Sequence, residues 1–343
     1  MKAIQLVKYG PAKTAFKTAE VPTPKLNNKE DILIQVHAFG LNFADIMARK
    51  GLYRAAPDLP AILGYEVVGE VVKVNDKENN HLIGKKVLSL TRFGGYAEFV
   101  QSTSLSISLI PDFLSDGEAL ALATQYCTAY LAMESCKNLK QSDNILVHSA
   151  SGGVGTAITQ LAKIKGCKVF GLTRSGSKVD YLKSNGVDFP IITSEKDYLK
   201  VITENPSFSK VQATFNSVGG ETLKKDFQLL DTTGEIVFFG ISDRTNQKKG
   251  LLFTLFQLLK IGKIHPAKLL LNSQSIHGLN LLAIGDKNPE QITYALEKLI
   301  SLVKEKKIMP HAKHGFDWDK IALAHHGIEN GDFTGKVFIK VNS

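Results

Sequence analysis

The pattern of hydrophobic and polar positions changes character near residue 125. Before that point, short runs rich in β-branched residues, at 32–36 (ILIQV) and 67–72 (VVGEVV), predict β-strands between turns rich in Gly and Pro. After it, apolar runs at 144–148 and 168–172 alternate with helix-length segments. This alternation is typical of βαβ units with a parallel sheet, so we expect an α/β fold with a doubly wound domain beside a β-rich one.

The hydrophobic pattern also predicts elements in the last part of the chain. Apolar residues at three- and four-residue steps, from Ile292 to Val303, predict an amphipathic helix over about 290–307. The segment after residue 285 is too short for a core of its own, and we expect it to pack on the first region. The expected domains are therefore 1–124 with 285–343, and 125–284. Further strands are expected at 213–215, 236–239, 275–279 and 336–341, and further helices from the turn after 148 to 165 and over 178–185.

Composition and charge indicate an ordinary globular protein and argue against a nucleic-acid-binding one. A hydrophobic fraction of 43% and a charged fraction of 22% are those of an ordinary globular protein of 343 residues. Three cysteines, Cys127, Cys136 and Cys167, form neither a disulfide framework nor a zinc-knuckle spacing, and the first residues do not resemble a signal peptide. We expect a cytoplasmic location. The net charge of +9 is concentrated in 125–284 without a dense basic run, which favours an anionic cofactor over nucleic acid.

A glycine-rich turn, ASGGVG at 150–155, directly follows the strand that ends at His148 and precedes a helical stretch. Glycines here let the backbone approach a pyrophosphate, whose charge then lies at the helix N-terminus. Ala150 stands where a strict GxGxxG motif has its first glycine. Because strand, turn, helix and second strand fit a unit of about 30 residues, we expect this region to bind a dinucleotide.

The end of the second strand indicates which dinucleotide. NAD-binding domains usually carry an acid about 20 residues after the glycines, to bind the ribose 2′-hydroxyl. Here residues 173–178 read TRSGSK, with no acid, and Arg174 and Lys178 are able to meet a 2′-phosphate. The alternative is a solvated basic loop without a ligand. We favour NADPH.

Several motifs follow one another in an order that covers nearly the whole chain: 40–45 (GLNFAD), 51–53 (GLY), 64–66 (GYE), 128–130 (TAY), 150–155, 216–220 (NSVGG), 239–240 (FG) and 335–336 (GK). In this order they resemble the medium-chain dehydrogenase/reductase superfamily. Within it the chain is similar to the zinc-free quinone oxidoreductases, and to the branch named for vesicle amine transport proteins through 41–49 (LNFADIMAR).

The resemblance implies a GroES-like catalytic domain, a Rossmann cofactor domain and a substrate site between them. It also implies hydride transfer from NADPH to quinones, enones or related α,β-unsaturated carbonyls, as in enzymes of EC 1.6.5 type or enoyl reductases. Asn42 and Tyr53 match positions from which a side chain donates to the substrate oxygen, although Tyr53 fits equally well as a packing aromatic. The cofactor-binding residues that we expect are Thr128, Ser151, Gly152, Gly153, Val154, Thr173, Arg174, Ser175, Lys178, Asn216, Val218, Phe239, Gly240, Ile241, Leu279 and Lys336.

Zinc is not expected, although alcohol dehydrogenases of this superfamily bind it. Their ligand positions fall on Asn42, Tyr65 and Thr124, and none of these side chains is a competent zinc ligand. The adjacent pair His325 and His326 has no ligand spacing, and we expect both residues on the surface.

Two further features concern partners. The strand at 275–279 is expected at the edge of the sheet, where pairing across a two-fold axis would give a homodimer. The leucine-rich stretch 251–271 fits a buried or dimer-covering segment. The less favoured alternative is a patch that lies on a membrane surface or binds a lipid, in a protein that retains NADPH with little catalysis.

Overall fold

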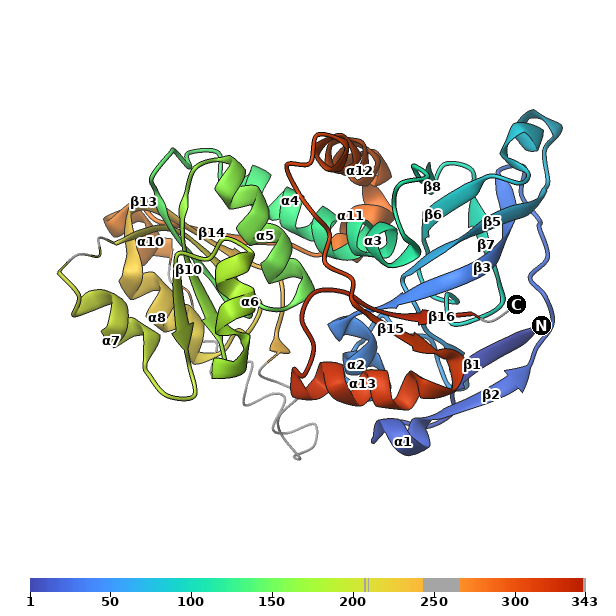
Figure 1. Cartoon of the computed structure of the whole chain (residues 1–343), viewed down its shortest axis with the longest axis horizontal. Helices are drawn as coiled ribbons and strands as arrows, with labels where there is room; N and C mark the ends of the chain where they lie inside the picture. Colours follow the sequence, from blue (N-terminus) through green and yellow to red (C-terminus); the bar gives the residue numbers. More distant parts are fainter. Residues whose placement is uncertain (207, 209, 243–263, 265, 342–343) are drawn as a thin grey trace. The chain divides into compact units, whose positions relative to one another are not determined.

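The computed structural model describes residues 1–206, 208, 210–242, 264 and 266–341. The chain forms two compact units (Figure 1). The first comprises Met1–Cys127, Leu282–Ser301 and Pro310–Ser343, and the second comprises Thr128–Leu281 and Leu302–Met309.

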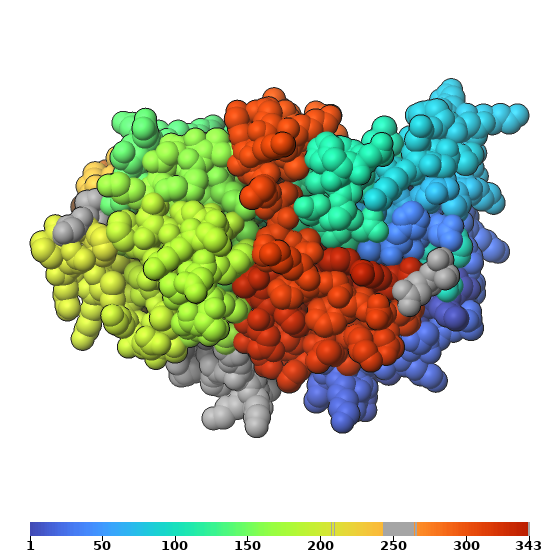
Figure 2. All heavy atoms as spheres, in the orientation of Figure 1, coloured from blue at the N-terminus to red at the C-terminus, as the bar shows by residue number. Residues whose placement is uncertain are grey.

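The first unit is rich in β-structure. A small antiparallel sheet has the order β2-β1-β4, and a larger one has the order β15-β16-β3-β5-β6-β8, with β7 also paired to β3. The bounds are β1 Lys2–Leu6, β2 Phe16–Glu20, β3 Asp31–Leu41, β4 Ala61–Ile62, β5 Glu66–Val74, β6 Lys86–Leu90, β7 Phe99–Thr103, β8 Ile107–Leu109, β15 His314–Asp317 and β16 Val337–Lys340. The turn between β5 and β6, which contains the 3-10 helix Lys77–Leu82, stands out from the surface (Figure 2).

The C-terminal segment completes this unit. β16 runs antiparallel to β3, with Val337 opposite Leu41, so the end of the chain adds a strand to this sheet. Helix α12 (Pro289–Lys304) buries Ile292, Leu296 and Leu299, as the helical periodicity predicts. The remaining helices of this region are α1 Ala12–Ala15, α2 Phe43–Arg49, α3 Asp116–Ala121, the π-helical turn Leu122–Tyr126, α11 Leu281–Lys287, the 3-10 turn Trp318–Lys320 and α13 Ile321–Asn330.

The core of the first unit overturns one expectation from the sequence. His325, expected on the surface with His326, is fully buried. Its ring lies 4.6 Å from that of Phe16, and its Nε2 lies 3.1 Å from the hydroxyl of Tyr96. His326 is exposed, because it lies on the other face of α13. Burial lowers the pKa of His325 well below its ordinary value, so the ring is neutral within this apolar core.

The second unit is built on a parallel sheet of six strands in the order β11-β10-β9-β12-β13-β14. Counted along the chain this is the order 3-2-1-4-5-6, which is that of dinucleotide-binding sheets. Every neighbouring pair is parallel. The bounds are β9 Asn144–Val147, β10 Lys168–Thr173, β11 Phe189–Ile192, β12 Val211–Asn216, β13 Leu230–Phe238 and β14 Ser275–Gly278.

Helices connect and cover these strands. α5 contacts β9 and β10, α6 contacts β11, and α8 contacts β12 and β13 as well as α7. Their bounds are α4 Cys127–Ser135, α5 Gly153–Ile164, the 3-10 turn Gly176–Lys178, α6 Val179–Ser184, α7 Tyr198–Thr203, α8 Glu221–Leu229 and α10 Pro266–Asn272.

Two expectations concern the end of this unit. Among the described strands β14 lies at the edge of the sheet, as predicted. Most of the leucine-rich stretch, residues 251–263 and 265, lies outside the described residues. None of the described helices has the length and apolar character needed to cross a bilayer.

Candidate functional site

A cluster of buried polar side chains surrounds Lys336 in the first unit. Asn42 follows β3 and stands at the N-cap of α2, Glu66 is the first residue of β5, and Lys336 directly precedes β16. Because β3 lies between β16 and β5 in the sheet, strand pairing brings these three residues together. Thr124 joins them from the π-helical turn, a local irregularity that is frequent at functional sites.

Hydrogen bonds engage all three donors of the Lys336 ammonium. Its Nζ donates to Asn42 Oδ1 at 3.1 Å, to the Leu41 carbonyl at 3.4 Å and to the Glu66 carboxylate. The Nδ2 of Asn42 donates to both carboxylate oxygens of Glu66, at 2.8 and 2.9 Å, and the Thr124 hydroxyl also donates to Glu66. The carboxylate and the ammonium are both completely buried, so each compensates the charge of the other.

This geometry bears on two of the expected roles. The Nδ2 of Asn42 already donates to Glu66, so a substrate oxygen would compete with that carboxylate for the amide. Lys336, a residue expected to bind the cofactor, uses the three donors of its ammonium group inside the first unit. Gly40 makes room for the pair, because a Cβ there would lie 1.9 Å from Glu66 Oε1.

A second carboxyl group lies nearby. Asp45, in the first turn of α2, accepts a hydrogen bond from the backbone N–H of Asn42 at 2.8 Å and is fully buried. Burial, with a smaller contribution from the negative charge of Glu66, raises its pKa to about 7. Asp45 therefore exchanges its proton near neutral pH.

Tyr53, the other expected donor, lies half-buried in the loop after α2. Its ring meets that of Tyr65 edge to face, with centroids 6.2 Å apart, and Tyr65 in turn packs against Phe93 at 5.2 Å. Burial raises the pKa of both phenols, so each hydroxyl keeps its proton and remains a hydrogen-bond donor.

The chemistry of these residues does not fit a catalytic zinc. Asn42, Tyr65 and Thr124 occupy the expected ligand positions and offer an amide, a protonated phenol and a hydroxyl, whereas zinc takes Cys, His or carboxylate ligands. Glu66, the carboxylate that Asn42 and Thr124 contact, is paired with Lys336. Across the part of the chain that the structure describes, no group of three or more His, Cys, Asp or Glu side chains is arranged to hold a metal ion.

In the second unit, the carboxyl ends of the parallel strands meet at one edge of the sheet, where ligands of such folds bind. Except for Thr128, in α4, and Lys336, every residue expected to bind the cofactor follows one of these strand ends. The residues after β9 are Ser151, Gly152, Gly153 and Val154; Thr173, Arg174, Ser175 and Lys178 end or follow β10; Asn216 and Val218 end or follow β12; Phe239, Gly240 and Ile241 follow β13; and Leu279 follows β14.

The glycine-rich turn has the backbone features that a phosphate requires. Gly152 is the N-cap of α5 and makes no side-chain cap bond, so the cap leaves the first amides of the helix, which have no intrahelical partner, available to an anion. Gly155 permits a close approach, because a Cβ there would lie 2.4 Å from the Ser149 carbonyl oxygen. Ala150, in place of the motif's first glycine, is fully buried beside Gly171. These features fit a dinucleotide.

The loop after β10 carries the charges expected to select the nucleotide. Thr173 is buried at the end of the strand, Arg174 is exposed, and Lys178 is half-buried. Ser175 caps the 3-10 turn by accepting a hydrogen bond from the Ser177 amide at 3.3 Å. The loop therefore presents two cations and no acid between 173 and 178, which fits a 2′-phosphate better than a ribose 2′-hydroxyl.

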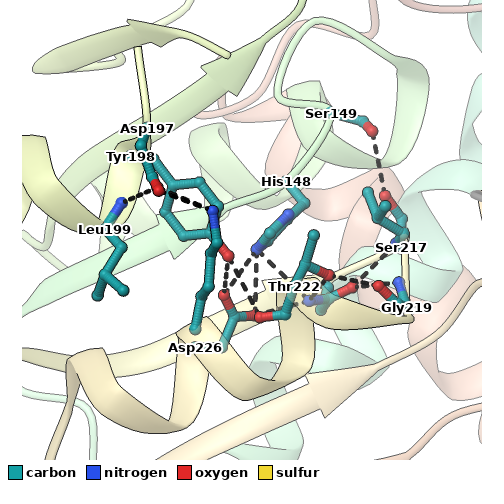
Figure 3. A network of polar contacts seen from close by, with 12 residues as sticks. His148, Ser149, Asp197, Tyr198, Leu199, Ser217, Gly219, Thr222 and Asp226 are labelled. Atoms are coloured by element: carbon teal, nitrogen blue, oxygen red, sulfur yellow. Dashed lines mark hydrogen bonds and ion pairs between the residues drawn. The ribbon is translucent and has the colours of Figure 1, made fainter. Parts of the chain in front are cut away.

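Sequence reasoning missed a buried network beneath this edge, centred on Asp226 of α8 (Figure 3). The carboxylate accepts hydrogen bonds from His148, directly after β9, from Tyr198 of α7 and from Asn216 at the end of β12. A signal was present, since Asp226 lies on the face of α8 that buries Leu223 and Leu229. A carboxylate at such a core position indicates buried donors around it.

Comparisons with known proteins agree with this geometry. Residues 28–129 match the family model described as alcohol dehydrogenase GroES-like domain, and residues 153–297 match the model described as zinc-binding dehydrogenase. The human synaptic vesicle membrane protein VAT-1 homolog is 32% identical over 333 residues, which cover 96% of this chain and 83% of that protein. Human quinone oxidoreductase is 26% identical over 343 residues, with coverage of 99% and 97%.

Solved structures show the same fold. The quinone oxidoreductase from Coxiella burnetii is 31% identical, with a TM-score of 0.81 and coverage of 100% of this chain and 99% of that one. The Escherichia coli quinone oxidoreductase complexed with NADPH is 24% identical, with a TM-score of 0.85 over 99% and 100% of the two chains. The first unit is thus a GroES-like domain and the second a Rossmann domain. The chain belongs to the medium-chain dehydrogenase/reductase superfamily of oxidoreductases, with VAT-1 homologs and quinone oxidoreductases among its relatives.

Proposed function

We propose that the protein is a zinc-independent, NADPH-dependent oxidoreductase that transfers hydride to quinones or other α,β-unsaturated carbonyls. The observation that carries the proposal is the edge of the parallel sheet at which the glycine-rich turn, Arg174, Lys178 and the turn after Asn216 follow neighbouring strand ends. Relatives named quinone oxidoreductase, at 26% and 31% identity, support the substrate class. The reaction would be of EC 1.6.5 type or an enoyl reduction.

Each part of the sheet edge has a role in this proposal. The amides of Gly153 and Val154, with Ser151, bind the pyrophosphate, and Arg174 and Lys178 bind the 2′-phosphate. Val218 and residues 239–241, which follow β12 and β13, would hold the nicotinamide, and this ring would supply the hydride. The choice of NADPH rests on the two cations, because the Escherichia coli complex, at 24% identity, shows the fold alone. Thr128, Thr173, Ser175, Asn216 and Leu279 complete the proposed cofactor site.

The substrate class follows from the donors around Asn42. A carbonyl that is reduced without a Lewis acid must spread the developing charge itself, as quinones and enones do through conjugation. The first unit then supplies position and hydrogen bonds, from the hydroxyl of Tyr53 and from the amide of Asn42, which would exchange a bond to Glu66 for one to the substrate. Residues 1–124 with 285–343 form the proposed catalytic domain, and 125–284 the cofactor domain.

The proposed assembly is a homodimer in the cytoplasm. β14 lies at the edge of the described sheet, where a second copy would satisfy its unpaired backbone groups. Light scattering at micromolar concentration tests this, and a monomer would contradict it.

The experiment that tests the function follows NADPH oxidation by the purified protein with an ortho-quinone, a para-quinone and an enone. Turnover with at least one acceptor, faster with NADPH than with NADH, is expected. No oxidation with any of the three would contradict the proposal.

A second candidate is favoured by one observation in α10. Leu270 and Leu271 are 80% and 84% exposed beside Lys268, an arrangement that suits the surface of an anionic membrane. In this alternative, the protein binds lipid and retains NADPH with little catalysis. Sedimentation with anionic liposomes distinguishes the two, since the oxidoreductase is expected to remain in the supernatant.

A further inference from the structure

Asp226 places a carboxyl group where a globular protein rarely buries one. The side chain is completely buried in the second unit, on the face of α8 that also buries Leu223 and Leu229. A buried carboxylate is costly unless hydrogen-bond donors compensate for the lost water. Its surroundings therefore indicate what the carboxylate holds in place.

Three donors from three different elements reach this carboxylate. His148 Nε2 lies 3.0 and 3.1 Å from the two oxygens, and the Tyr198 hydroxyl donates to Oδ1 at 2.9 Å. Asn216 Nδ2 donates to Oδ2 at 2.6 Å. Figure 3 shows His148 and Tyr198 directed at Asp226. An ionised carboxyl group, which only accepts, suits such an arrangement of donors.

The bond to Asp226 fixes which way the Asn216 amide points. Because Nδ2 donates to Asp226 and to the Thr222 hydroxyl, Oδ1 must face the other way. There it accepts from the backbone amides of Val218 and Gly219, both at 2.9 Å. The carboxylate thus determines, through one side chain, the conformation of the turn that follows β12.

The bond to His148 positions the start of the glycine-rich turn, the other loop at this edge of the sheet. His148 is followed by Ser149, whose φ of 50° is unusual for a residue other than glycine, and then by the glycine-rich turn. The Ser217 hydroxyl donates to that of Ser149 at 3.2 Å, so the two loops are also joined directly (Figure 3). One buried group therefore holds the ends of β9 and β12.

These two strands mark a special point of the sheet. β9 and β12 are neighbours, and the strand order changes direction between them. In open α/β sheets, ligands bind outside the carboxyl ends of the strands at such a point. The network lies directly beneath it.

We propose that Asp226, together with His148, is a positioning group of the dinucleotide site. It holds the turn at 217–219 and the start of the glycine-rich turn in the arrangement that binds the cofactor, so that little ordering remains when the cofactor arrives. This inference rests on the proposed binding of NADPH. Asp226 itself touches neither reactant, and its effect passes through Asn216 and His148.

The test measures the Kd of NADPH by nucleotide fluorescence in the full-length protein, for wild type and three variants. Asp226→Ala removes the acceptor for all three donors. Asp226→Asn keeps an oxygen for Asn216 and directs its NH₂ toward the Tyr198 oxygen, so the turn is retained. Asp197→Ala is the matched control, because Asp197 caps α7 and pairs with Lys225 at the half-exposed surface.

The expected Kd for NADPH rises about tenfold or more in Asp226→Ala, as for the loss of a hydrogen bond to a charged group. Asp226→Asn should stay within about threefold of wild type, and Asp197→Ala should be unchanged. The KM for a quinone at saturating NADPH should not move in any variant, which a general loosening of the fold would not predict. Thermal unfolding without nucleotide verifies that each variant is folded at the assay temperature.

If Asp226→Ala does not fold, His148→Ala replaces it, because Asp226 then keeps two of its three donors; a rise in Kd is again expected. A Kd equal to that of wild type in the folded variants would overturn the inference alone. If wild-type protein does not bind NADPH, the proposed function fails and the inference fails with it.

Discussion

The ammonium of Lys336 and the carboxylate of Glu66 form an ion pair with no exposure to solvent. The two residues lie far apart in the sequence. They meet because β16, which follows Lys336, and β5, which begins at Glu66, both pair with β3 in the sheet. Gly40 of β3 leaves room for this ion pair, because a Cβ there would lie 1.9 Å from Glu66 Oε1 and 2.7 Å from Lys336 Nζ. The pair holds Asn42 by both ends of its amide, so it also determines the orientation of a proposed substrate-binding residue.

Removal of one partner should be far more costly than removal of both. Lys336→Met leaves the charge of Glu66 buried without compensation, and we expect the free energy of unfolding to fall by about 3–5 kcal/mol. The double variant Lys336→Met/Glu66→Gln should recover most of this loss. Urea unfolding measures both values. Lys320→Met, which breaks an exposed pair with Asp319, is the control and should cost less than about 1 kcal/mol. A similar loss of stability in Lys336→Met and Lys320→Met would contradict the prediction.

The same residues predict the metal content of the protein. Asn42, Tyr65 and Thr124 supply none of the three ligands that a catalytic zinc needs, and the nearby ammonium repels a divalent cation. Purified protein should contain no stoichiometric zinc and should keep its activity in EDTA. Elemental analysis that finds one tightly bound zinc per chain would refute this.

Local patterns in the sequence predicted much of the parallel sheet. β9 and β10 begin at Asn144 and Lys168, as expected, because each run of β-branched residues is bounded by turn residues. β13 begins at Leu230, well before the apolar run expected at 236–239. The first half of β13, LDTTG, has the composition of a turn. It is also irregular, because Thr233 has a φ of 65° and the pairing with β12 contains a register shift.

Contacts between distant residues could not be predicted in this way. The burial of His325, in α13, depends on Phe16 of β2 and on Tyr96 in the loop before β7. The role of Asp226 depends equally on His148, at the end of a strand far earlier in the sequence. Periodicity identifies which face of a helix is buried, but it does not identify the donor that lies against that face.

The stability of the protein should depend on the proton of Asp45. Burial raises its pKa from 3.8 to about 7, so the folded protein keeps a proton that the unfolded chain releases at neutral pH. This contribution is fully present below about pH 4 and is lost as the pH rises through about 7. Asp45→Asn, which keeps the oxygen that accepts from the Asn42 amide, should raise the free energy of unfolding at pH 8 by roughly 2–4 kcal/mol. Urea unfolding at pH 5 and pH 8 tests this, and an equal effect at both values would count against it.

Two of the three glycines in the glycine-rich turn, Gly152 and Gly155, should respond differently to alanine. In Gly155→Ala the new Cβ would lie 2.4 Å from the Ser149 carbonyl oxygen and 2.6 Å from Ala150 Cα, so the backbone must shift. Overpacking of this kind costs about 1–3 kcal/mol, and NADPH binding should weaken as well. Gly152→Ala is the milder comparison, because its Cβ would lie 3.3 Å from the Ser149 carbonyl oxygen, which a shift of a few tenths of an ångström relieves, and its φ of −79° suits any residue. An equal loss of stability in both variants would show that close approach is not the cause.

The choice between NADPH and NADH should depend on Arg174. Its exposed guanidinium follows β10, and a charge-assisted hydrogen bond from such a group is worth about 1.5–3 kcal/mol, or roughly 10- to 150-fold in affinity. Arg174→Ala should raise the KM for NADPH by about that factor and leave the KM for NADH nearly unchanged. Thr173→Asp should shift the preference further toward NADH, because a carboxylate repels the 2′-phosphate.

Lys183→Ala, which removes an exposed cation from the neighbouring α6, is the matched control and should alter the KM of neither nucleotide. If wild-type protein used both nucleotides equally, or if Arg174→Ala weakened both alike, this loop would not select the cofactor.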